Sequence, residues 1–87
     1  MGEVYIEMLT SPGCVNCPAV KKMLKELTDE LKGDITVEEV DITAEPTRAA
    51  QYGVMSVPAV AINGILQFVG VPKREELKKA IMDELEA

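Results

Sequence analysis

The chain alternates short apolar runs with longer stretches in which apolar residues recur at helical spacing. The run Val4–Leu9 is short and mostly apolar, which is typical of a buried strand. From Val15 the apolar positions fall three and four residues apart and charged residues fill the opposite face, which predicts a helix ending near Lys32 with Gly33 as its cap. The pattern predicts five further elements: a strand over Ile35–Ile42, a short helix from Pro46 to about Tyr52 that Gly53 stops, strands over Val54–Ile62 and Ile65–Val69, and a helix over Lys73–Glu86.

Two local features indicate how the strands pair. Asn63-Gly64 separates two apolar runs and predicts a tight antiparallel hairpin. The apolar positions of 35–42 slip in phase around Glu38-Glu39, which indicates a bulge or a partly exposed strand near a sheet edge. The resulting order, β-α-β-α-β-β-α, predicts an α/β fold with a four-stranded mixed sheet and helices on both faces, in one domain over residues 1–87.

Both cysteines of the chain, Cys14 and Cys17, lie three residues apart where the first strand gives way to the first helix. Unpaired N–H groups and the helix dipole at a helix N-terminus favour a thiolate by up to about 2 kcal/mol, which lowers a thiol pKa from ~8.5 toward ~7. The chain has no histidine, and the nearest cations, Lys21 and Lys22, are expected two helical turns from Cys14. We therefore expect a moderately lowered pKa for Cys14.

The spacing assigns different roles to the two sulfurs. Cys14, at the mouth of the turn, is the candidate nucleophile, and Cys17, shielded one turn into the helix, would resolve a mixed disulfide. A structural staple is the weaker interpretation, because a disulfide across so short a loop contributes little stability. Two further alternatives stay open: two copies of the chain holding zinc or an iron–sulfur cluster through Cys14 and Cys17, and a non-catalytic redox adaptor.

Composition narrows the functional classes. The net charge of −6 argues against nucleic acid and acidic membrane surfaces as partners. The N-terminal residues lack the features of a signal peptide, and no apolar run is long enough for a membrane span, so we expect a cytoplasmic protein. One chain offers two thiols and no imidazole, so we expect no metal and no cofactor other than the redox-active disulfide.

The middle and the end of the chain carry a family resemblance. Asp41–Pro46, then Tyr52-Gly53-Val54 and Ser56-Val57-Pro58, then Asn63-Gly64 and Gly70, together with the CxxC pair, resemble the thioredoxin/glutaredoxin superfamily over nearly the whole chain. The short length and the entry Leu9–Gly13 are most similar to glutaredoxins and small archaeal thioredoxin-like proteins. This resemblance implies the thioredoxin fold and a thiol–disulfide oxidoreductase. It also implies a cis bond before Pro58, which base rates alone disfavour about twentyfold.

The same resemblance implies a substrate groove beside the cysteine pair, where the backbone of Val57 would pair with an extended substrate strand. The residues implied to contact substrate are Pro12, Gly13, Val15, Met55, Ser56, Val57, Pro58, Gly70 and Val71. The implied partners are proteins with disulfide bonds and an upstream reductase such as a thioredoxin reductase-like flavoenzyme. We expect a monomer that works in the reductive direction, since nothing near Cys14 stabilises its thiolate strongly.

Overall fold

A computed structural model describes residues 3–31, 33–53 and 56–86 of the chain. The elements follow the predicted order: β1 (Val4–Thr10), α1 (Cys17–Leu31), β2 (Ile35–Asp41), α2 (Pro46–Tyr52), β3 (Ala59–Ile62), β4 (Ile65–Val69) and α3 (Arg74–Leu85). The four strands form one mixed sheet in the order β2-β1-β3-β4. β1 and β2 are parallel, whereas β3 pairs antiparallel with both β1 and β4, so the predicted mixed sheet is confirmed.

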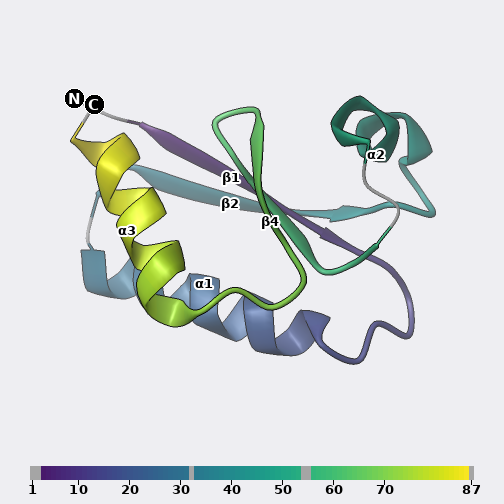
Figure 1. Cartoon of the computed structure of the whole chain (residues 1–87), viewed down its shortest axis with the longest axis horizontal. Coiled ribbons are helices and arrows are strands. Elements are labelled where there is room, and N and C mark those ends of the chain that lie inside the picture. The colour runs from purple at the N-terminus through teal and green to yellow at the C-terminus, as the bar shows by residue number, and fades with distance from the viewer. Residues whose placement is uncertain (1–2, 32, 54–55, 87) are drawn as a thin grey trace.

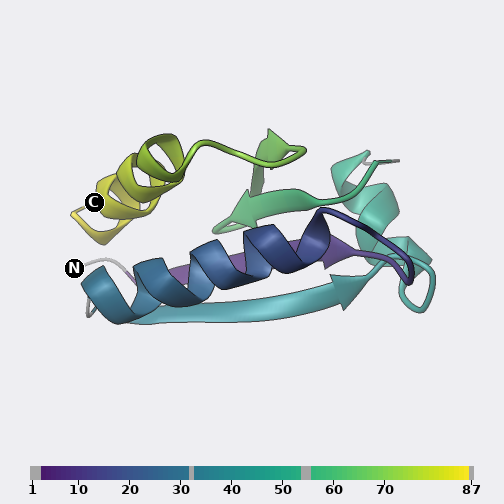
Figure 2. The ribbon, with the colours of Figure 1, turned by 90° about the horizontal axis from the view of Figure 1, so that it is seen from below.

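The helices cover both faces of the sheet (Figures 1 and 2). Successive residues of β1 point to opposite faces, so Ile6 and Met8 pack with α1 and α3, while Leu9 packs with α2. On the first face, α1 contributes Val20, Leu24 and Leu27 and α3 contributes Leu77 and Ile81 to the larger core. The second core is smaller and contains Leu9, Val40, Ala49 and Ala59. The long helix α1 is thereby fixed along β1, with its first residue at the carboxyl end of that strand.

Two element starts differ from the sequence prediction by more than one residue, those of α1 and β3. Helix α1 begins at Cys17 instead of Val15, because the carbonyl of Asn16 is the first that accepts a helical hydrogen bond, from the Val20 N–H at 3.4 Å. It ends at Leu31, and Lys32 lies outside the described residues. Strand β3 begins at Ala59 because Pro58 has no N–H to donate to the ladder. Val54 and Met55 lie outside the described residues.

For residues 35–42 the sequence predicts either a bulge or a partly exposed strand near a sheet edge, and the second alternative is confirmed. β2 is an edge strand, but its pairing with β1 runs without a shift from Val4/Ile35 to Thr10/Asp41. The irregularity in the sheet lies between Val60 and Ala61, where the register of β3 against β4 shifts. The polar phase of β2 therefore reflects an exposed edge rather than a bulge.

The Asn63-Gly64 hairpin is confirmed, and both turn residues have positive φ angles, 50° and 82°. This is the geometry of a type I′ turn, which favours an Asn-Gly pair. The Asn63 side chain also links the turn to its surroundings. Its Oδ1 accepts a hydrogen bond from the Tyr5 N–H at 2.8 Å, and its Nδ2 donates to Glu84 of α3 at 2.9 Å.

A polar cluster joins α2 to the sheet. Arg48 of α2 forms ion pairs with Glu7 of β1 at 2.6 Å and with Glu38 of β2 at 2.8 Å. Tyr52 donates a hydrogen bond to Glu7, and Tyr5 donates one to Glu38. Hydrogen bonds from Arg48 and then Tyr5 lower the pKa of Glu38 to about 2. The hydrogen bond to Glu7, assisted by burial, raises the pKa of Tyr52 to about 12.

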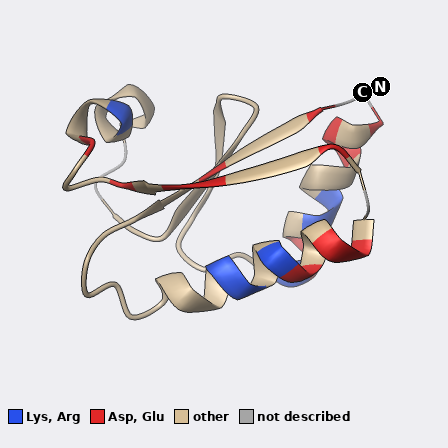
Figure 3. Ribbon diagram, turned by 180° about the vertical axis from the view of Figure 1, so that it is seen from behind, with Lys and Arg blue, Asp and Glu red and all other residues tan. Residues whose placement is uncertain are grey.

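The charged residues are distributed unevenly along the ribbon (Figure 3). Acidic segments mark both parallel strands, and α1 carries acidic and basic segments in turn.

None of the helices in the described part of the chain combines the length and the hydrophobicity needed to span a lipid bilayer.

Candidate active site

A tight turn places Cys14 after β1. The Cys14 N–H donates a hydrogen bond to the Ser11 carbonyl at 3.2 Å, which closes a four-residue turn. Gly13 has φ 79° in this turn. A type II turn favours proline at its second position and requires positive φ at its third, which Pro12 and Gly13 supply. The sequence Ser11-Pro12-Gly13 therefore folds locally so that Cys14 faces the beginning of α1.

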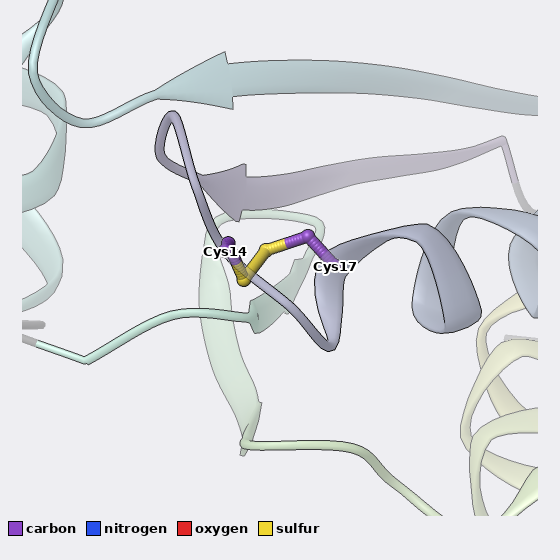
Figure 4. Close-up of a disulfide and its surroundings, with 2 residues drawn as sticks. All are labelled: Cys14 and Cys17. Atoms are coloured by element: carbon purple, nitrogen blue, oxygen red, sulfur yellow. A yellow bond between two sulfur atoms is a disulfide. The ribbon is translucent and has the colours of Figure 1, made fainter.

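Cys17 is the first residue of α1, and it is bonded to Cys14 through a disulfide (Figure 4). The two Cα atoms lie 5.5 Å apart, within the usual range for a disulfide. Cys14 is half-buried and packs against the larger core, whereas Cys17 belongs to that core with only 5% of its surface exposed. The two sulfurs thus differ in access, with Cys14 the more open. The N-terminus of α1 lies at Cys17, so Cys14 is not itself a helical residue. The disulfide bond to Cys17 links it to the start of the helix.

A cavity of about 310 Å³ opens beside the disulfide. Its lining residues are Met8, Thr10, Ser11, Gly13, Cys14, Cys17, Pro18, Lys21 and Glu39. Two of these lining residues, Lys21 and Glu39, form an ion pair with 2.9 Å between Nζ and Oε2. Lys21, which is expected two helical turns from Cys14, therefore lines the same cavity as both cysteines.

The segment before β3 lies at the junction of the two cores. Val57 packs against both of them, and Pro58 is buried. The Val57–Pro58 peptide bond is cis. The Pro58 carbonyl accepts a hydrogen bond from the Gly70 N–H at 2.7 Å, so two of the residues implied to contact substrate are joined directly.

The other residues in that implied set are mostly exposed. Pro12, Gly13, Val15 and Ser56 are exposed, and Val71 is 48% exposed. Val15 is 89% exposed, the most open of the large apolar side chains described. Among the members of the set that the structure describes, Gly13 alone lines the cavity beside the disulfide. The prediction for Met55 lies outside the described residues.

From the sequence, Lys21 is identified as a nearby cation but not as a site residue, and Glu39 is not identified. Lys21 follows Cys17 by four residues, a helical spacing that places two side chains on the same face, so this spacing could have identified it. No local spacing in the sequence could have identified Glu39, because its place beside the cavity depends on its pairing with Met8 in the β1–β2 register. Among the described residues, no group of three or more His, Cys, Asp or Glu side chains is arranged to hold a metal ion.

Comparison with known proteins agrees with this geometry. The family model described as "Thioredoxin domain" matches residues 4–82. A protein named "Probable Thioredoxin" from Methanothermobacter thermautotrophicus is 48% identical over 83 residues, which cover 95% of this chain and 98% of that protein. A "Thioredoxin" from Methanocaldococcus jannaschii is 40% identical over 85 residues, covering 98% of this chain and 100% of that protein. The crystal structure of a protein disulfide oxidoreductase from Aeropyrum pernix k1 has a TM-score of 0.83 and 35% identity, covering 98% of this chain and 38% of that chain.

The fold, the CxxC disulfide and these similarities define a thiol–disulfide oxidoreductase with a thioredoxin fold. The chain belongs to the thioredoxin family and is similar to its small archaeal members, as the sequence resemblance predicts.

Proposed function

We propose that the chain reduces disulfide bonds in other proteins, with Cys14 as the attacking thiolate and Cys17 as the resolving thiol. The difference in access carries this proposal: Cys14 is half-buried at the mouth of the cavity, whereas Cys17 is 5% exposed. An incoming disulfide can reach the more open sulfur, and the buried one is protected from a second substrate.

The exchange balances in two steps. The Cys14 thiolate forms a bond to one substrate sulfur and the substrate S–S bond breaks, which releases the other substrate sulfur as a thiolate. Cys17 then loses its proton and attacks Cys14, which forms the Cys14–Cys17 disulfide and releases the second substrate thiolate. Two electrons pass from the dithiol to the substrate, and both released thiolates take up protons from water.

The reductive direction is supported by the charges around the pair. The strongest oxidants of this class stabilise their reduced thiolate strongly. Here the one cation lining the cavity in the described part of the chain, Lys21, is paired with Glu39. A reductase, such as the flavoenzymes that serve other thioredoxins, would return the disulfide to the dithiol. We place this cycle in the cytoplasm, where a CxxC pair works transiently, and in a monomer.

The substrate would lie along the exposed residues next to the disulfide. Val15 and Val71 offer exposed apolar surface, and the segment Ser56–Pro58 precedes the first ladder position of β3. An extended substrate segment could pair there with the backbone of Val57. Pro12, Gly13 and Gly70 complete the proposed contact surface.

Insulin reduction by the wild-type protein and two single variants tests the proposal. Cys14→Ser should abolish turnover, and Cys17→Ser should accumulate a mixed disulfide through Cys14 that mass spectrometry identifies. If the wild type does not reduce insulin but its disulfide state changes partner binding, the adaptor alternative replaces the enzyme. Visible absorbance with bound zinc or iron in freshly purified protein would favour a metal centre shared between two copies.

A further inference from the structure

The charges that line the cavity beside the disulfide come from two elements. Lys21 comes from α1, one helical turn after Cys17, and Glu39 comes from β2, next to Met8 in the strand register. The lining residues from β1 and its following loop, Met8, Thr10, Ser11 and Gly13, carry no charge. In the described part of the chain, Lys21 and Glu39 are thus the charged residues that line this cavity together with both cysteines.

The ion pair also lines a second cavity of about 310 Å³ between α1 and β2. Met8, Lys21 and Glu39 are common to both cavities, and Lys25 and Asp29 of α1 face only the second one. Lys21 and Glu39 are 64% and 45% exposed, so their side chains have the freedom to change partners. An exposed pair of this kind contributes little to stability.

We propose that Lys21 is the positioned cation that stabilises the thiolate of the reduced pair and that Glu39 competes with the sulfurs for it. In the disulfide state the sulfurs are neutral and Lys21 pairs with Glu39 at 2.9 Å. Reduction places a negative charge in the same cavity, and Lys21 is then shared between the thiolate and the carboxylate. The ion pair therefore tunes both thiol reactivity and reduction potential. This inference rests on the proposed dithiol function.

The sign of each substitution follows from this competition. Lys21→Gln removes the cation, so it should raise the Cys14 thiol pKa by about half a unit, a roughly threefold loss of thiolate at a given pH below the pKa. It should also lower the reduction potential, because the reduced form loses stabilisation. Glu39→Gln frees Lys21 for the sulfurs, so it should lower the pKa and raise the potential. Both shifts should shrink at high salt, since the charges are exposed.

The test measures thiolate absorbance against pH and the redox equilibrium with glutathione, in the full chain without any substrate. Lys22→Gln is the matched control, because Lys22 is the neighbouring exposed lysine and does not line the cavity. Lys21→Arg should restore wild-type values. In a double-mutant cycle, Glu39→Gln should move the pKa less in the Lys21→Gln background, where no cation is left to release.

Three results would overturn the inference: no shift for Lys21→Gln, shifts of the same sign for Lys21→Gln and Glu39→Gln, or equal effects of Glu39→Gln in both backgrounds. These readouts do not depend on turnover. Expected shifts in a protein that fails to reduce insulin would leave the tuning intact and refute the proposed function, whereas full turnover without shifts would refute the tuning alone.

Discussion

Arg48 Nη2 lies 2.6 Å from Glu7 Oε2, an ion pair that joins the short helix α2 to the central strand β1 across 41 residues of sequence. Glu7 is the one charged side chain that is buried in the described part of the chain, at 7% exposed. Arg48 also reaches Glu38 and Glu45, so one guanidinium serves three carboxylates. The ion pairs that attach α2 to the sheet therefore all depend on a single basic residue.

Arg48→Met should destabilise the protein by about 2–3 kcal/mol, because it leaves the Glu7 carboxylate buried without its cation. Urea unfolding at neutral pH measures the change. Arg74→Met is the matched control: Arg74 bridges Glu26 and Glu30, but all three side chains are more than 40% exposed. Its loss should cost about 1 kcal/mol or less. Equal losses in the two variants would contradict a special role for the Glu7 pair.

Alkaline pH should weaken the fold through Tyr52. An unfolded tyrosine loses its proton near pH 10, whereas the hydrogen bond to Glu7 holds the pKa of Tyr52 at about 12 in the folded chain. Between these values the unfolded chain binds fewer protons, so the free energy of unfolding falls as pH rises from about 10 to about 12. Tyr52→Phe should flatten that decline in urea unfolding series across this range. A decline of unchanged slope in Tyr52→Phe would assign the effect to other groups.

The hairpin turn should be sensitive to Asn63 for two separable reasons. Asn63→Ala removes the acceptor for the Tyr5 N–H and places alanine at φ 50°. We expect a loss of about 2–3 kcal/mol in thermal or urea unfolding. Asn63→Gly removes the same hydrogen bond without the backbone strain, so it should cost about 1 kcal/mol less than alanine. A glycine variant as unstable as the alanine variant would show that the hydrogen bond alone sets the cost.

We expect the exposed side chain of Val15, beside the disulfide, to contribute to substrate binding and not to the stability of the fold. Val15→Ser should leave the free energy of unfolding within about 0.5 kcal/mol, since Val15 is 89% exposed. It should raise KM for a protein disulfide while kcat stays unchanged, as expected for a lost binding contact. Ile65→Ser is the control, because Ile65 is also exposed but lies away from the cysteines. It follows the hairpin turn and pairs with Ile62, which in turn pairs with Ile6 in the first half of β1. Equal KM changes for both would refute a local contact at Val15.

The order of elements could be predicted from the sequence because each depends on local pattern. Apolar periodicity, the Asn63-Gly64 pair and the glycine after Tyr52 each report on their own neighbourhood. Gly53 has φ 64° and its N–H bonds back to the carbonyls of Ala49 and Ala50, as a helix-ending glycine should. The edge position of β2 is likewise indicated by the polar residues Glu38 and Glu39, which interrupt the alternation of apolar positions in this strand.

The remaining features depend on how distant segments meet. Glu7 is visible as a carboxylate within an apolar run, but its pairing with Arg48 requires knowing where α2 docks on the sheet. Glu39 lines the same cavity as the cysteines because β2 pairs beside β1 in one particular register. Lys21 can be recognised in the sequence as a cation near Cys14, but its place in the lining of the cavity depends on Cys17, which begins the helix one turn before it.

The aromatic residues of the polar cluster decide what optical spectroscopy can observe in this protein. The chain has no tryptophan, and its two tyrosines, Tyr5 and Tyr52, both donate hydrogen bonds to carboxylates of the Glu7–Arg48–Glu38 group. We therefore expect intrinsic fluorescence to report the release of α2 from the sheet, whereas following the redox state of the sulfurs by fluorescence requires a tryptophan or a dye introduced beside them.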